Sequence, residues 1–398
     1  MAALAIDGGP RVRVRPLAPW PFFDDEAVDA ATRVLRSGLV NYRTGQEGLR
    51  FEEEFAARVG SRFGVALANG TVALELALRV LDVGPGDEVV VPSRTFVATA
   101  SAVAQVGATP VFADVDETSQ TLTPATIAPH LGPRTRAVIA VHLAGWPCPM
   151  GPVVELCRAR GIRVVEDCAQ AHGARVDGRE VGAWGDVAAF SFCQDKILTT
   201  AGEGGMLTCD DPELRARAWS FKDHGKRLED APAPGASFRY VHDAVGTNWR
   251  ISELHAAVGR VALRRLDAWL ARRREHAALL DARLGRLAAL RVTIPPPGVL
   301  HAYYKYYAFV RPERLRRGWD RDKILQAIAA EGIPCFQGSC SEVYRERAFR
   351  AIAPSAPRPV ARALGETSLM LLVHPTLEVD AIEDTCRAVE KVMAAASR

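Results

Sequence analysis

Short runs of apolar residues alternate with amphipathic stretches along the first two thirds of the chain. Five of these runs are apolar without interruption, and they lie near Val89, Phe112, Ile139, Val164 and Ala189. Strands that are apolar on both faces belong to a buried, mainly parallel sheet. Between the runs, the segments that begin at Thr71 and Gly151 carry apolar residues at helical spacing. This alternation of strand and helix predicts a layered α/β domain with helices on both faces of the sheet.

The pattern changes after Trp249. One long helical pattern follows, rich in arginine, with apolar residues that return at the spacing of one helix face. A proline-rich break at residues 294–298 then precedes a strand-like segment, HAYYKYYAFV, and two further helical patterns near residues 322–331 and 379–395. These elements predict a smaller C-terminal domain of the α+β class.

Composition and charge narrow the class of protein. A chain of 398 residues that is 48% hydrophobic and 24% charged has room for two globular domains. We expect a large α/β domain over residues 1–270 and a small α+β domain over residues 271–398. The net charge of +3 and the absence of long basic runs argue against a nucleic-acid partner.

Two further features bear on location and on metal binding. No stretch reaches about 18 consecutive apolar residues, and arginines and prolines interrupt the N-terminal segment, so we expect a cytoplasmic protein without a membrane span. The 8 cysteines are scattered without zinc-binding spacing. We interpret nearly all of them as reduced core thiols and expect no metal site.

Polar residues follow two of the predicted strands at their carboxyl ends, where open α/β sheets bind ligands. The strand near Val164 ends with Asp167, and Gln170 lies in the turn that follows it. The strand near Ala189 ends with Ser191, and Lys196 comes shortly afterwards. A lysine that closes an apolar run is paired, extended to solvent or covalently engaged, and we favour the last of these interpretations.

A third candidate element lies at Asn69, Gly70 and Thr71, directly before a predicted helix. Free backbone amides at a helix start, with a glycine and a hydroxyl beside them, form an anion site. An ordinary helix cap by Asn69 or Thr71 is the alternative. The chain has neither a dinucleotide-binding G-x-G-x-x-G after its first strand nor a P-loop motif, which favours a single phosphate as the anion.

Together, a lysine, a strand-end carboxylate and a phosphate site suit pyridoxal 5′-phosphate (PLP). The aldehyde of this cofactor needs an amine, its ring nitrogen needs a carboxylate, and its phosphate needs fixed donors. We therefore predict a PLP-binding protein in which Lys196 and Asp167 carry the chemistry.

The motifs that contain these residues resemble those of a known family. They include NGTVALELAL from residue 69, EDCAQAHGA from residue 166, FSFCQDKILTTAGEGG from residue 190 and GTNWRISELHAAVG from residue 246. The chain resembles the DegT-type PLP-dependent sugar aminotransferases from end to end. This resemblance implies the fold-type-I aminotransferase fold.

The resemblance also implies roles for single residues around the cofactor ring. Lys196 would hold the aldehyde as a Schiff base, and Asp167 would pair with the pyridine nitrogen. Phe96 would stack on the ring, and Gln170 would reach the ring hydroxyl. Considered alone, Phe96 is also compatible with core packing and Gln170 with ordinary hydrogen bonding at a strand end.

The cofactor phosphate would be held by Gly70, Thr71 and Ser191. Asn248 would enter the site from a neighbouring subunit, which implies a homodimer with shared active sites. Without the resemblance, Ser191 could simply form hydrogen bonds at its strand end, and Asn248 could be a turn residue.

The function implied is transfer of an amino group from L-glutamate to a keto-sugar nucleotide, in amino-deoxysugar biosynthesis for a surface polysaccharide or a natural-product glycan. A keto-cyclitol aminotransferase and a non-catalytic PLP-binding regulatory protein are the open alternatives. A sugar dehydratase is disfavoured, because the dehydratases that resemble this family replace the lysine with histidine, whereas this chain has Lys196.

Two positions depart from the family pattern. Ala144 stands where family members often carry tyrosine, and Ile197 stands where they often carry asparagine. We expect both near the pocket, so they bear on the substrate. Candidate pocket residues of lower rank are Glu203 and the histidines His142, His172, His224 and His374, and the segment HGKRLED from residue 224 could form a loop over the substrate.

Overall fold

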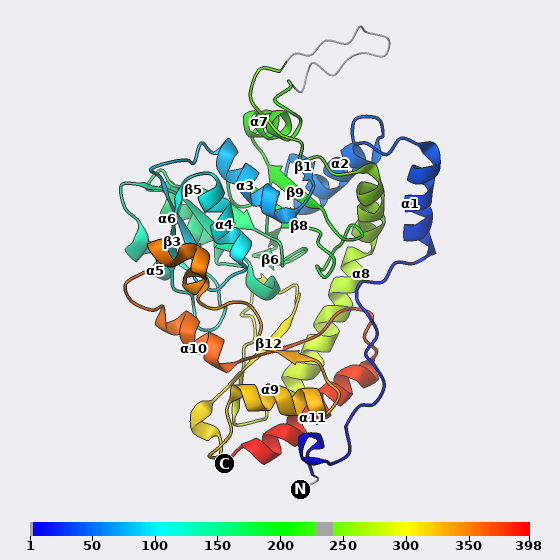
Figure 1. The fold of residues 1–398 in the computed structure, drawn as a ribbon, viewed down its shortest axis with the longest axis vertical. Helices are drawn as coiled ribbons and strands as arrows, with labels where there is room; N and C mark the ends of the chain where they lie inside the picture. The colour runs from blue at the N-terminus through cyan, green and yellow to red at the C-terminus, as the bar shows by residue number, and fades with distance from the viewer. Residues whose placement is uncertain (1–2, 228–241) are drawn as a thin grey trace.

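A seven-stranded sheet forms the centre of the larger part of the molecule in the computed structural model, which describes residues 3–227 and 242–398 (Figure 1). Its strands lie in the order β1 (Phe63–Leu67), β9 (Gly205–Cys209), β8 (Val187–Ser191), β5 (Arg163–Asp167), β4 (Thr135–Val141), β2 (Glu88–Pro92) and β3 (Thr109–Ala113). Strands β8, β5, β4, β2 and β3 pair in parallel, and β9 runs antiparallel between β8 and β1. The predicted parallel sheet is confirmed, whereas β1 and β9 were not among the predicted strands.

Helices cover both faces of this sheet because alternate strand residues point to opposite sides. Val65 and Val89 pack in one cluster with α3 (Gly70–Val80), α4 (Val97–Gln105) and α7 (Pro212–Lys222). Ala66 and Val90 lie in the clusters of the opposite face, with α2 (Glu47–Val59), α5 (Pro124–Ile127) and α6 (Met150–Arg158). The result is the predicted three-layer α/β arrangement.

The long helix α8 (Glu253–Leu284) runs from the large sheet to the smaller part of the molecule (Figure 1). Leu266 and Leu270 pack in the core that includes the large sheet, whereas Leu280 and Leu284 pack in the core of the smaller part. The predicted boundary at residue 270 therefore falls inside one continuous helix, and the division remains a prediction.

The smaller part contains a four-stranded antiparallel sheet in the order β10 (Leu290–Val292), β12 (Tyr306–Val310), β14 (Ser368–Leu371) and β13 (Cys335–Phe336). Its helices are α9 (Arg321–Ala330), α10 (Pro359–Thr367) and α11 (Val379–Ala396). A short third sheet joins β11 (Val299–Leu300) to β6 (Arg175–Val176) and β7 (Arg179–Glu180) of the larger part. Only the second half of HAYYKYYAFV is a strand, β12.

The N-terminal segment connects both parts before α1 (Asp25–Ser37) begins. Arg13 forms a buried ion pair of 2.7 Å with Asp384 of α11. Further along, the indole Nε1 of Trp20 donates a hydrogen bond of 3.0 Å to the carbonyl oxygen of Lys196. The segment therefore extends from the smaller sheet's helices to the strand-end region of the larger part.

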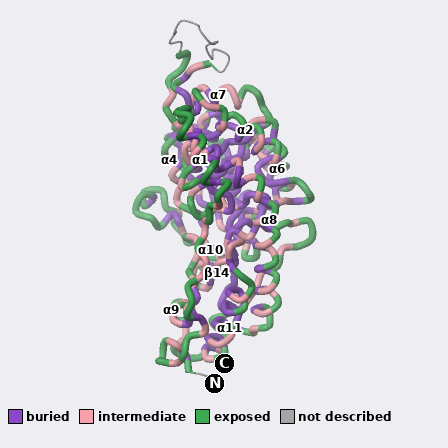
Figure 2. The backbone as a smooth tube through the Cα atoms, turned by 90° about the vertical axis from the view of Figure 1, so that its right-hand side faces the viewer, coloured by how far each residue is buried: buried purple, intermediate pink, exposed green. Residues whose placement is uncertain are grey.

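Buried residues concentrate along the sheets and the inner side of α8, and α1 and α9 carry many exposed positions (Figure 2). All 8 cysteines are free thiols, and five of them are buried: Cys148, Cys157, Cys168, Cys209 and Cys386. Within the described ranges, no helix combines the length and the apolar character needed to cross a bilayer.

Candidate active site

A cavity of about 940 Å³ opens at the carboxyl ends of β5 and β8, between the large sheet and the smaller part. Seven of the eight predicted site residues line it: Gly70, Thr71, Phe96, Asp167, Gln170, Ser191 and Lys196. The eighth, Asn248, is exposed and does not line the cavity of its own chain. Strand ends from distant parts of the sequence thus meet as open α/β sheets require.

Asp167 is the last residue of β5 and is only 6% exposed. Its carboxylate accepts hydrogen bonds from the Thr99 hydroxyl at 2.9 Å and from the Ala169 backbone N–H at 3.1 Å. Burial raises the pKa of Asp167, although these two donors and the nearby Lys196 oppose the effect. The site therefore holds a carboxylate that would be stabilised further by a positive partner.

Lys196 lies in a turn after β8, and its Nζ is 5.1 Å from the centre of the Tyr304 ring. The turn is fixed on both sides of the side chain, because the Lys196 N–H donates to the Cys193 carbonyl oxygen and the Lys196 carbonyl accepts from Trp20. The amine is thus presented to the cavity from a backbone held at both its polar groups.

The predicted phosphate site lies at the start of α3. The Asn69 side chain accepts from the Val72 N–H at 3.0 Å and caps the helix, as one of our alternatives proposed, and no acidic residue follows in the first turn. A Cβ atom on Gly70 would lie 2.5 Å from the Cβ of Ser191, so only glycine allows the helix start to approach the end of β8 this closely. The helix cap does not exclude an anion site here, because the Gly70 and Thr71 amides precede the Val72 N–H group that Asn69 occupies.

Phe96 is 63% exposed and lines the cavity at the start of α4, so it does not pack in the core. Gln170 also lines the cavity, and its Oε1 accepts a hydrogen bond of 2.7 Å from the Ala144 N–H. This bond fixes the side-chain amide of Gln170 with its nitrogen free to donate.

Several cavity residues were not predicted from the sequence. Tyr304 and Lys305 directly precede β12, and Asp195 accepts a hydrogen bond from the Tyr304 hydroxyl. Thr99 of α4 reaches across to Asp167. The only sequence signal for Lys305 is a charged residue within an otherwise apolar and aromatic run, HAYYKYYAFV.

Ala144 and Ile197, expected near the pocket, are adjacent to residues that line the cavity but do not line it themselves. Ile197 is fully buried in the core that also contains Phe192, and Ala144 is buried as well. Ala144 has a φ of 58°, and its backbone contacts Gln170 and Tyr304, so it acts on the site through its main chain. Glu203 does line the cavity.

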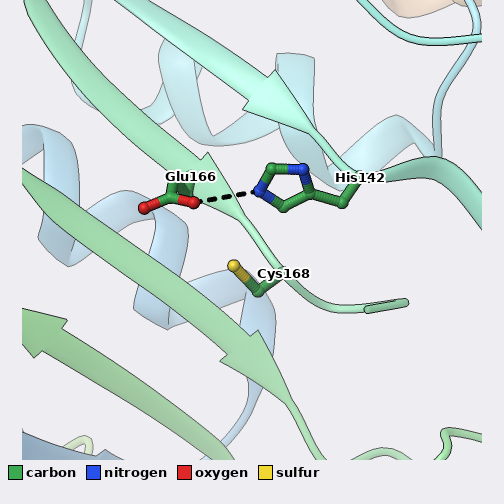
Figure 3. A group of neighbouring side chains, drawn as sticks. All are labelled: His142, Glu166 and Cys168. Carbon is green, nitrogen blue, oxygen red and sulfur yellow. Dashed lines mark hydrogen bonds and ion pairs between the residues drawn. The ribbon is translucent and has the colours of Figure 1, made fainter. Parts of the chain in front are cut away.

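None of the four candidate histidines lines the cavity. His142 is buried with Glu166 and Cys168 behind the strand ends (Figure 3). Its Nε2 lies 3.1 Å from Glu166, and its Nδ1 accepts from the Cys148 N–H at 3.0 Å. The loop suggested for residues 224–230 lies partly outside the described residues.

Both oxygens of the Glu166 carboxylate have backbone partners in addition to His142. They accept hydrogen bonds of 2.7–2.8 Å from the N–H groups of Gly182, Trp184 and Gly185. The lone pairs of this buried group are therefore used in joining β4, β5 and the turn before β8. We interpret the cluster as a support for the strand end that carries Asp167.

The sequence profile of the DegT/DnrJ/EryC1/StrS aminotransferase family matches residues 21–390. The chain belongs to this family. A solved aminotransferase from Psychrobacter cryohalolentis is 46% identical and superimposes with a TM-score of 0.93, covering 96% of this chain and 99% of that one. The fold and the family resemblance predicted from the sequence are both confirmed.

Two curated relatives resemble the present chain over most of their own length. A UDP-N-acetyl-3-dehydro-α-D-glucosamine 3-aminotransferase from Acidithiobacillus ferrooxidans is 36% identical, with 93% of this chain and 94% of that one covered. An L-glutamine:2-deoxy-scyllo-inosose aminotransferase from Streptomyces kanamyceticus is 38% identical, with 83% of this chain and 79% of that one covered.

Enzymes of this family depend on PLP, and a solved relative from Streptococcus pneumoniae is in its PMP form. The residues of the cavity fit such a cofactor. The Lys196 amine and the buried Asp167 carboxylate line the same cavity, and so does the aromatic ring of Phe96. Gly70, which has no side chain, lets the start of α3 lie close to Ser191. Lys196 and Asp167 could hold the aldehyde and the ring nitrogen, and Gly70, Thr71 and Ser191 the phosphate. These single-residue roles remain predictions.

Proposed function

We propose that this aminotransferase transfers an amino group from L-glutamate to a keto-sugar nucleotide, in the cytoplasm, for amino-deoxysugar biosynthesis. The observation that carries the proposal is that Lys196 and Asp167 line one cavity of about 940 Å³ at the strand ends. This volume accommodates a cofactor together with a bulky substrate. The relative from Acidithiobacillus ferrooxidans, whose name specifies a UDP-linked keto sugar, supports the substrate class.

When bound, PLP supplies an aldehyde that links covalently to amines and a ring that withdraws electrons from the linked carbon. Asp167 would support this chemistry, because its buried carboxylate would favour the protonated form of the ring nitrogen. Lys196 would tether the aldehyde, and its Nζ would be the group that carries protons to and from the reacting carbon. The same amine would serve with the amino donor and with the keto acceptor.

A keto-cyclitol acceptor is the second candidate, favoured by the similarity to the 2-deoxy-scyllo-inosose aminotransferase. Both acceptors present a ring ketone, and they differ in whether a nucleotide is attached. Assaying UDP- and dTDP-linked keto sugars beside keto-cyclitols, with glutamate or glutamine as the donor, separates the two candidates.

We further propose that the enzyme is a homodimer in which Asn248 reaches the partner's cavity. Two observations support this. Asn248 is exposed and lies outside its own cavity, and large apolar side chains are exposed on α1 and the segments beside it: Phe22, Val28, Leu35, Leu39 and Val40. Exposed apolar groups of this kind are typical of subunit interfaces.

The K196A variant tests the catalytic assignment. We expect it to lose the visible absorption of the covalently held cofactor and at least 10³-fold of the transamination rate, because tether and proton carrier are removed together. An exposed lysine on α9, Lys323, provides the matched control, and K323A should retain wild-type spectrum and rate. A K196A protein with the wild-type spectrum and full turnover would refute the assignment.

A further inference from the structure

The cavity has a second amine. Among the described residues that line it, the basic side chains are Lys196 and Lys305, and no arginine is present. Lys305 lies directly before β12 of the smaller sheet, and its side chain is 16% exposed. A largely buried ammonium group in a cavity wall is costly unless an anion compensates for its lost hydration.

The protein compensates Lys305 only in part. Its Nζ lies 3.7 Å from Oδ2 of Asp195, which is longer than a hydrogen bond, and Asp195 also accepts the Tyr304 hydroxyl. The Asp195 side chain is 52% exposed, so water weakens the attraction. Burial lowers the pKa of Lys305, and the attraction of Asp195 opposes this only partly.

Lys305 and the reacting amine of Lys196 lie against the same aromatic ring. Its Nζ is 4.8 Å from the centre of the Tyr304 ring, and Lys196 Nζ is 5.1 Å from the centre of the same ring. Any amino-acid donor brings a carboxylate next to the carbon that reacts. Because Lys196 is committed to the cofactor in the proposed function, Lys305 is the cation left on these walls to receive that carboxylate.

We propose that Lys305 is the carboxylate-binding residue of the substrate site and determines specificity for acidic substrates. This inference rests on the proposed function. The ligand chemistry is a carboxylate beside the reacting carbon, and it could belong to the amino donor or to a keto substrate that is itself a sugar acid. Tyr304 and Asp195 position the ammonium group, since the Tyr304 ring lies beneath it and Asp195 limits its movement.

Equilibrium binding to the PLP-loaded enzyme tests the proposal without turnover. Glutarate represents the donor, D-glucuronate represents a sugar acid, and D-glucose is the uncharged counterpart; each is titrated by calorimetry. We expect K305Q to bind at least one of the acids roughly 10- to 100-fold more weakly, because a charged hydrogen bond is lost. K305R, which keeps the charge, should recover part of this loss.

The control is K323Q, which removes an exposed lysine that lies over the Trp319 ring, and it should bind both acids like the wild type. If K305Q loses affinity for glutarate alone, the subsite belongs to the donor. If it loses affinity for glucuronate alone, the subsite belongs to the acceptor, and if it loses affinity for both, the subsite receives each in turn. Unchanged binding of both acids to K305Q, or no binding of either acid to the wild type, overturns the proposal.

Failure of this inference is distinct from failure of the proposed function. If the wild type converts glutamate and a keto-sugar nucleotide but K305Q binds acids normally, only the role of Lys305 is wrong. If the wild type shows no transamination yet binds glutarate through Lys305, the carboxylate site stands and the proposed reaction is wrong.

Discussion

A buried carboxylate such as that of Asp167 is unfavourable for folding before any partner binds. Its two hydrogen-bond donors, Thr99 and Ala169, do not fully replace the lost hydration, and the pKa of the carboxyl group is raised. Groups of this kind, destabilising to the fold and aimed into a cavity, are characteristic of functional sites.

We predict that D167N makes the cofactor-free enzyme more stable. When folding raises the pKa of a carboxyl group, its protonated form favours the folded state. This stabilisation is fully present below the pKa of the unfolded chain, near 4, and is lost as the pH rises through the higher pKa of the folded protein. At pH 7 the amide should therefore raise the melting temperature of the cofactor-free protein by roughly 1–3 °C, a difference that shrinks below about pH 4. Calorimetric melting across this pH range measures the effect.

The same variant should bind PLP at least 10-fold more weakly, because the ring nitrogen loses its charged partner. Titration of cofactor-free protein with PLP, followed by absorbance, provides this second readout. A D167N protein that melts below the wild type at pH 7 contradicts the argument from burial.

A second prediction at the residue scale concerns Gly70. Its added Cβ would lie 2.5 Å from the Ser191 Cβ, so G70A should separate α3 from β8, destabilise the protein by about 1–3 kcal/mol and weaken phosphate-dependent PLP binding. Gly132 is the control, because a Cβ there meets nothing within 4 Å and its φ lies outside the left-handed region. Urea unfolding of both variants should show a loss for G70A alone.

At the scale of elements, helix α2 is held at its start by a residue of another helix. Its N-cap, Gln46, provides no side-chain hydrogen bond. Instead the Glu253 carboxylate, at the start of α8, accepts from the N–H groups of Glu47 at 2.5 Å and Gly48 at 3.0 Å. The two helices that flank the same face of the sheet are thereby joined at their N-termini.

We therefore predict that E253A is destabilised by about 1–3 kcal/mol, because two N–H groups of α2 lose a charged acceptor. E275A, on the exposed side of α8, removes a surface ion pair with Arg272 and should change stability by less than about 0.5 kcal/mol. Urea denaturation midpoints compare the two. Equal effects of both substitutions would show that the cap contributes little.

How far the sequence predicts the structure also differs from one element to another. Continuous apolar runs such as that around Val164 identify a buried parallel strand from local information, and the strand ends then identify Asp167 and Ser191. Lys305 and Thr99 could not be predicted in this way, because their place in the site depends on how α4 and the residues before β12 approach the sheet in three dimensions. Ile197 shows the limit of sequence proximity: although it follows Lys196 in the sequence, it is buried in the core and does not line the cavity.

At the scale of the whole molecule, the proposed dimer predicts that active sites are shared. K196A and a variant of Asn248, each inactive alone, should regain activity when mixed and allowed to exchange subunits. With equal mixing, about half of the dimers are hybrids, and each hybrid has one site that contains both intact residues. About a quarter of the wild-type activity is therefore the limit.

Light scattering measures the mass and so checks that the enzyme is a dimer. K196A mixed with itself provides the baseline activity. If mixing restores nothing although hybrid dimers form, Asn248 does not act across the interface.

The N-terminal segment contacts residues that the ribosome synthesises much later. Pro10 accepts a hydrogen bond of 2.8 Å from Lys391, and Arg13 pairs with Asp384, so these contacts need residues that follow 381 and 371 positions later in the sequence. At 5–20 residues per second, this delay amounts to roughly 20–80 s. The same segment carries Trp20, whose indole N–H holds the backbone carbonyl of Lys196. We therefore expect the enzyme to acquire its cofactor late, only once α11 has been synthesised and has bound the N-terminal segment.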